Sequence, residues 1–130
     1  MSIRKRLILI LLLLLLFVII ACVSMLYNTN QVIDDFKNVV SGSIDRNVDY
    51  GELLERYDVF NCKGFERADV EIRRTFVMHN FKRGIMNVNY TIYAYDKDGV
   101  VIYGSHNVPS TWHIEKTNGR WTVVKISEAP

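Results

Sequence analysis

The feature that most constrains this chain is an unbroken apolar run near its start. Seventeen consecutive apolar residues extend from Leu7 to Val23, and apart from Ser24 the run continues to Tyr27. As a helix, residues 7–27 would extend about 31 Å, which matches the hydrocarbon core of a bilayer. A buried helix that is apolar on every side is not expected in a chain of 130 residues. We therefore predict a membrane-directing segment at residues 1–27, either a transmembrane helix or a signal peptide.

The charged residues divide the chain at the same place. Arg4, Lys5 and Arg6 precede the apolar run, and the first acidic residue is Asp34. Without these three bases, 13 Lys and Arg remain against 14 Asp and Glu, so the net charge of +2 reflects the N-terminus. The positive-inside rule predicts a cytoplasmic N-terminus and an extracytoplasmic domain at residues 28–130. A nearly neutral domain outside the cytoplasm argues against nucleic-acid binding.

Retention or removal of the apolar segment depends on Cys22. Residues 19–22, Ile-Ile-Ala-Cys, resemble the lipobox of bacterial lipoproteins, in which the cysteine is acylated. Against this, the residues after Cys22 remain apolar. We favour an uncleaved anchor over lipidation at Cys22, and both alternatives give the same topology. Cys62 is then the only cysteine of the outer domain, so no internal disulfide can form there, and we expect it to be buried and inert.

The outer domain begins with helical periodicity. Apolar residues recur at the spacing of one helix face from Val32 to Ile44, and Thr29 or Asn30 could cap that helix. A second helical pattern, residues 49–57, begins with the Asp-x-x-Glu spacing of a capping box. Two helices are therefore expected at the start of the domain.

After residue 66 the periodicity changes to that of strands. Alternating apolar residues occupy three segments, 70–78, 86–95 and 100–105. The clearest hairpin follows, because Asn118-Gly119 fits a two-residue turn, and its register places Trp112 and Trp121 on one face. The sequence predicts an α+β domain in which two helices pack on a curved antiparallel meander sheet of four to five strands.

The last part of the chain carries a family resemblance. Residues 112–126 form an aromatic strand, an Asn-Gly turn and a Gly-Arg-Trp strand. This ending resembles secreted or membrane-anchored bacterial members of the nuclear transport factor two-like superfamily, and the resemblance extends over residues 30–127. It implies a curved sheet wrapped around a helix, with a conical pocket that some members use for catalysis or ligands. The same scaffold hosts isomerases, dehydratases, sensors and assembly modules, so it does not specify a function.

Arg74 is the residue that most suggests a pocket. By alternation it shares the inward face with the apolar residues of 70–78, where a charge must be paired or must line a polar cavity. His106 could enter the same cavity. The alternative is a bulge that turns Arg74 outward beside Arg73.

No catalytic residue, metal site or cofactor is expected. The three histidines lack the paired spacing of a metal site, and Asp96-x-Asp98-Gly99 lacks the remaining ligands of a calcium loop. The sequence contains no glycine-rich phosphate loop, and no inward acid can be assigned as a general base. These observations favour a protein that is not an enzyme.

The outward face of the sheet offers an interface instead. Four apolar residues fall on that face by parity: Tyr93, Tyr95, Val124 and Ile126. An exposed apolar face on a small domain often marks an interface. We expect a membrane-tethered binding or assembly module, either a homo-oligomer or a partner of another envelope protein, such as a conjugation or secretion component or an immunity protein. The alternative is a small-molecule-binding pocket or a cryptic enzyme of the same fold, with Arg74 or His106 in the pocket.

Overall fold

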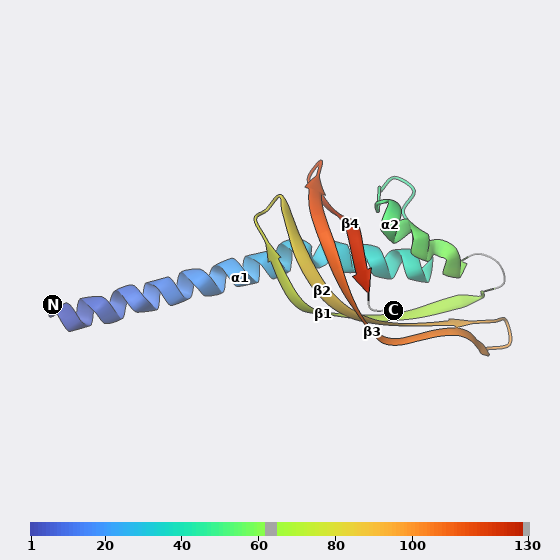
Figure 1. Ribbon diagram of the computed structural model, residues 1–130, viewed down its shortest axis with the longest axis horizontal. Helices are drawn as coiled ribbons and strands as arrows, with labels where there is room; N and C mark the ends of the chain where they lie inside the picture. The colour runs from blue at the N-terminus through green and yellow to red at the C-terminus, as the bar shows by residue number, and fades with distance from the viewer. Residues whose placement is uncertain (62–64, 129–130) are drawn as a thin grey trace.

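A four-stranded antiparallel sheet forms the domain, and a long helix projects from it (Figure 1). The computed structural model describes residues 1–61 and 65–128, and of residues 59–61 only the backbone. The helices are α1 (Ile3–Ser41), α2 (Glu52–Glu55) and the 3₁₀ helix η1 (Arg56–Asn61). The strands are β1 (Arg67–His79), β2 (Arg83–Tyr95), β3 (Val101–Thr117) and β4 (Arg120–Glu128), in the spatial order β1-β2-β3-β4. The expected α+β class and antiparallel meander are confirmed.

The apolar segment and the first helix of the domain form one continuous helix. α1 has 39 residues and so extends about 58 Å. Its first half projects freely, and its last turns lie against the sheet (Figure 1). The expected helix start at Thr29 or Asn30 is wrong, because the Thr29 hydroxyl donates to the Met25 carbonyl inside the helix, at 2.9 Å. The helix ends at Ser41, where Gly42 adopts a left-handed conformation with φ 84°.

The second helical region is shorter than its sequence pattern predicts. α2 has four residues and continues directly into η1. Asp49 does not form the expected capping box, because its carboxylate accepts a hydrogen bond from the Gly51 amide, at 2.9 Å, in a local turn before the helix. Leu54 is nevertheless buried against the core.

The core lies between α1 and the concave face of the sheet. Phe36 of α1 is its centre, with its ring centroid 5.0 to 5.4 Å from the rings of Tyr57, Tyr90 and Trp112. Trp112 and Trp121 are both buried, as the hairpin register predicts. That register is confirmed, since Lys116 pairs with Trp121 across an Asn118-Gly119 turn of positive φ. Each large apolar side chain buried here stabilises the fold by about 1.5–3 kcal/mol.

A bulge changes the orientation of the end of β1. Arg74 pairs with Val88 and Phe76 pairs with Asn87, so Thr75 is the extra residue. The alternation reverses at this point, and Val77 packs against the core while Phe76 and Met78 become exposed. The expectation that residues 70–78 share one inward face is therefore wrong beyond Arg74, because pairing with β2 inserts one residue.

Candidate functional site

The inward face of the sheet is occupied by the protein's own helix. Arg74 points inward, as its parity predicts, but it contacts α1: its guanidinium donates to Thr29 Oγ1 at 2.9 Å and to Asn30 Oδ1 at 2.8 Å. Burial lowers the pKa of Arg74, as expected for a cation taken partly out of water. Arg74 therefore joins β1 to the helix.

His106 lies on the opposite face from Arg74. Its Nδ1 is 3.1 Å from the hydroxyl of Tyr93, and its ring borders a polar groove of about 420 Å³ on the outward face. The structure thus does not bring Arg74 and His106 together in one cavity.

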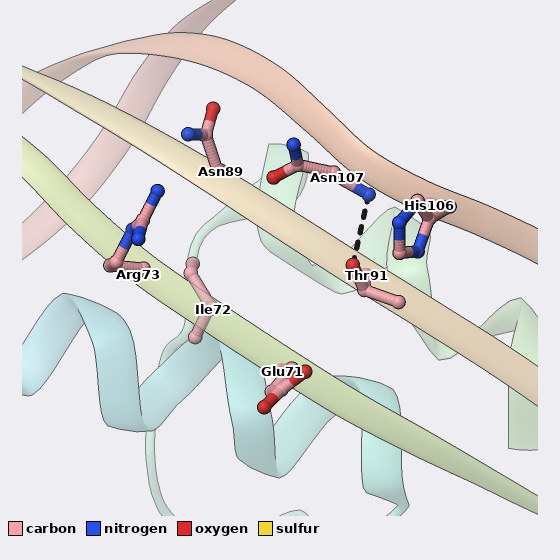
Figure 2. Close-up of a pocket in the computed structure, with 7 residues that line it drawn as sticks. All are labelled: Glu71, Ile72, Arg73, Asn89, Thr91, His106 and Asn107. Atoms are coloured by element: carbon pink, nitrogen blue, oxygen red, sulfur yellow. Dashed lines mark hydrogen bonds between the residues drawn. The ribbon is translucent and has the colours of Figure 1, made fainter.

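The polar groove crosses three strands. Figure 2 shows Glu71 and Arg73 from β1, Thr91 from β2 and His106 from β3, with α1 behind the strands. The Asn107 amide donates to Thr91 Oγ1 at 2.9 Å and fixes the local course of β3. In the described parts of the chain, no group of three or more His, Cys, Asp or Glu could hold a metal ion. The groove is an open polar surface.

A second groove on the outward face is mainly apolar. Four side chains that line it are between 40% and 60% exposed: Phe76, Met78, Ile85 and Val124. Its volume is about 750 Å³, and polar residues lie around it, including Arg83, His113, Glu115 and Lys125. Apolar patches bordered by charges are typical of protein interfaces. Of the residues expected at an interface, Val124 is in this groove.

Sequence reasoning missed Phe76 and Met78 because their exposure results from the bulge at Thr75. The interruption of the apolar alternation at Arg73-Arg74-Thr75 was the one sign of it.

The other expected interface residues are divided between the two faces. Tyr93 and Tyr95 are both half-buried. Tyr93 lies beside His106, and the guanidinium carbon of Arg67 lies over the Tyr95 ring, 4.3 Å from the centroid of that ring. Ile126 does not lie on the outward face: it pairs with Trp112 and packs against the core. A bulge causes this change: Lys125 pairs with His113, and Val123 pairs with the next residue, Ile114. Val124 is therefore the extra residue of β4.

His79 is a buried residue that the sequence did not single out. Its Nδ1 accepts a hydrogen bond from the Phe81 amide at 3.0 Å, and its Nε2 lies 3.4 Å from the Met25 carbonyl of α1. Burial lowers the pKa of His79, Lys116 lowers it further, and the contact with Met25 opposes them. Both contacts fit the neutral Nε2–H tautomer, in which Nδ1 accepts and Nε2 donates.

Of the two cysteines, Cys22 lies among the described residues. Cys22 is exposed on α1 and unpaired. Cys62, expected to be buried, lies outside the described residues.

Comparisons with known proteins do not identify a family. No protein-family model and no curated protein matches the sequence. Among solved structures, the chain is similar to the solution structure of a SEC-C motif containing protein from Rhodopseudomonas palustris. The two are 15% identical, the match covers 80% of this chain and 73% of that chain, and the TM-score is 0.35. So distant a likeness carries no argument about function.

Proposed function

We propose that this protein is a membrane-tethered, extracytoplasmic and non-enzymatic binding module, and that the apolar groove on its outward sheet face binds a protein partner. The observation that carries the proposal is the groove at Phe76, Met78, Ile85 and Val124. The inward face already packs on α1, so the outward face is the one available for a partner.

The tether rests on α1. Among the described residues, α1 is the one helix long and apolar enough to cross a membrane. In the structure, no residue of its most apolar 18-residue window is buried. A core helix of a soluble protein would be mostly buried. Arg4, Lys5 and Arg6 at its start support a cytoplasmic N-terminus.

The way α1 enters the domain suits a helix that positions the outward face of the sheet relative to the membrane. The helix passes from the apolar segment into the core without a break, and hydrogen bonds from Arg74 and Arg120 attach it to opposite edges of the sheet. A domain joined in this way holds its outward face at a fixed angle to the helix. Such an arrangement suits a partner that is itself in, or at, the same membrane.

Crosslinking in native membranes tests the proposed interface. A photo-crosslinking amino acid is placed at Ile85 in the groove, and in a control chain at Val101, which is similarly exposed on the far part of β3. We expect a discrete crosslinked protein from position 85, either a second copy or another membrane protein, and none from position 101. Crosslinks of equal pattern from both positions, or from neither, would contradict the proposal.

Substitutions provide the second arm of this test. Phe76→Asp places a charge in the groove, where Val101→Asp makes the same kind of change outside it. We expect Phe76→Asp to abolish the crosslink from position 85 and Val101→Asp to leave it intact. Near-UV circular dichroism of both variants checks that the fold is retained.

A further inference from the structure

The turn between β1 and β2 lies beside the helix at the end of its apolar segment. His79 is the last residue of β1, and its Nε2 lies 3.4 Å from the carbonyl oxygen of Met25. The Phe81 amide donates to the same ring, at 3.0 Å to Nδ1, so the turn is fixed to that level of α1. In Figure 1 this hairpin reaches α1 where the helix leaves the domain. If residues 7–27 occupy the bilayer, the turn is at the level of the lipid headgroups.

The turn combines an exposed aromatic residue with cations. Phe81 is 49% exposed and has φ 68°, a conformation that bulky residues rarely adopt. Lys82 and Arg83 follow it and are both exposed. Lys116 of β3 adds a third cation, because its amide donates to the Lys82 carbonyl at 2.8 Å. The nearby acid is Glu115, which pairs in register with Arg83, so three positive charges accompany one negative charge.

The turn is held by the Asn80 side chain and by a backbone hydrogen bond from the Asn80 amide to the Arg83 carbonyl, at 3.1 Å. The Asn80 side chain accepts hydrogen bonds from the amides of Lys82 and Arg83, at 3.1 and 3.0 Å. Gly84 is required behind the turn, since a Cβ there would collide with the Met78 carbonyl and the His79 Cβ. Lys82 and Arg83 are therefore exposed on a fixed turn. Phe81 is half exposed, with its ring edge-to-face against the His79 ring at 4.8 Å between centroids.

We propose that this turn binds the membrane surface, with Phe81 entering the interface and Lys82, Arg83 and Lys116 contacting anionic phospholipid headgroups. The inference rests on the proposed tether. It holds for either form of anchoring, because Cys22 precedes Met25 by only three residues, about 4.5 Å along a helix. Basic residues close to an anionic membrane attract it, and aromatic rings are favoured at the interface. The contact would fix the tilt of the domain on the membrane, and so the direction of its outward face.

Tryptophan fluorescence of the full chain in vesicles tests this inference. Phe81→Trp introduces a reporter in the turn, and Val101→Trp introduces a control on the far part of β3. Trp112 and Trp121 are buried and give a constant background. The vesicles contain phosphatidylcholine alone or with phosphatidylglycerol in a roughly two-to-one ratio, to compare neutral with anionic headgroups.

We expect the fluorescence emission of the tryptophan at position 81 to shift to shorter wavelength in vesicles that contain phosphatidylglycerol. Spin-labelled headgroups should quench this emission several times more strongly than the emission of the tryptophan at position 101. Adding salt should reverse the shift, because ions screen exposed charges. Lys82→Glu in the reporter chain should weaken the dependence on phosphatidylglycerol by at least about fivefold, because loss of one basic residue near the surface accounts for that factor and the added negative charge increases it. Lys97→Glu, the same change in the turn between β2 and β3, should have no effect.

Three results would overturn the inference, and they are distinguishable. In the first, the chain stays in the vesicles after carbonate extraction, but the tryptophan emission at position 81 is the same with and without phosphatidylglycerol. The turn then does not bind anionic headgroups, and the tether stands. If the chain is released by carbonate, the tether and the inference fail together. Protection of position 81 that requires another membrane protein instead of anionic lipid would also contradict the inference.

Discussion

The side-chain amide of Gln31 pairs with the backbone of Trp121, 90 residues away in sequence. Its Nε2 donates to the Trp121 carbonyl at 2.8 Å, and its Oε1 accepts from the Trp121 amide at 2.9 Å. β4 is an edge strand, so these backbone groups would otherwise have no partner on that side. A residue of α1 thus extends the hydrogen bonding of the sheet and joins the helix to β4.

Gln31→Ala should lower the free energy of unfolding by about 3 kcal/mol, since three hydrogen bonds of about 1 kcal/mol each are lost, two with Trp121 and one to Asp35. Denaturant unfolding of the full chain in detergent micelles, followed by tryptophan fluorescence, measures the change. Lys37→Ala, at an exposed position of the same helix, is the control and should change stability little. Equal stability of the two variants would show that the pairing with Trp121 contributes nothing.

Asp35→Asn should destabilise the domain by about 2 kcal/mol, because the buried carboxylate of Asp35 accepts from Arg120 at 2.9 and 2.7 Å. Burial raises the pKa of Asp35, although hydrogen bonds from Gln31 and Arg120 and the charge of Arg120 oppose it. The neighbouring Asp34 is exposed, so Asp34→Asn is a matched control. Thermal unfolding compares the two variants, and a melting temperature lowered equally in both would refute the assignment.

Thr29→Val should weaken the attachment of β1 to α1. The substitution keeps the shape but removes the hydroxyl that accepts from Arg74, so the guanidinium loses one partner at a cost of about 1 kcal/mol. Thr29→Ser keeps the hydroxyl and is the control. Faster hydrogen exchange in β1, without change in β4, is the expected readout. No difference between the Val and Ser variants would exclude a role for the hydroxyl.

Acidification should destabilise the domain through His79. Its pKa in the fold is lowered, so the unfolded chain takes up the proton first as the pH falls below the ordinary value of 6.5. Stability is therefore fully present above that pH and decreases as the pH falls toward the lower pKa of the folded state. His79→Asn should flatten this dependence between neutral pH and about pH 5, where unprotected histidines titrate. An unchanged pH dependence in His79→Asn would contradict the assignment to His79.

The state of the N-terminus has a direct readout. An uncleaved anchor predicts an intact mass of 15.1 kDa for the protein isolated from its native membranes. A chain that begins with an acylated Cys22 would be lighter and would carry the mass of its acyl groups. Mass spectrometry of the detergent-extracted protein distinguishes the two.

The sequence predicted the parts of the fold that local patterns determine. The Asn118-Gly119 hairpin and the burial of Trp112 follow from turn chemistry and alternation, and both are confirmed. A bulge beside Arg74 was one of two alternatives, but its position at Thr75 and the bulge at Val124 were not predicted, because a bulge depends on pairing with the neighbouring strand. Each bulge reverses the faces of the residues that follow it.

The continuity of α1 was missed for a related reason. Thr29 is a residue type that favours helix starts, but here its hydroxyl is satisfied by Arg74, 45 residues later in the chain. A contact so distant in sequence leaves no sign in the local pattern. The same holds for Arg74, for which the sequence left an inward and an outward position open and indicated no partner.

The unbroken course of α1 has a geometric consequence for evolution and engineering. Each residue of an α-helix adds a rotation of about 100° and a rise of about 1.5 Å. One alanine inserted between Val23 and Ser24 would therefore rotate the whole sheet by just over a quarter of a circle around the helix axis, about 100°. Seven alanines would return it to within about 20° of its original azimuth. If the outward face must meet a partner in the same membrane, function after insertions should follow the helical period and not the added length.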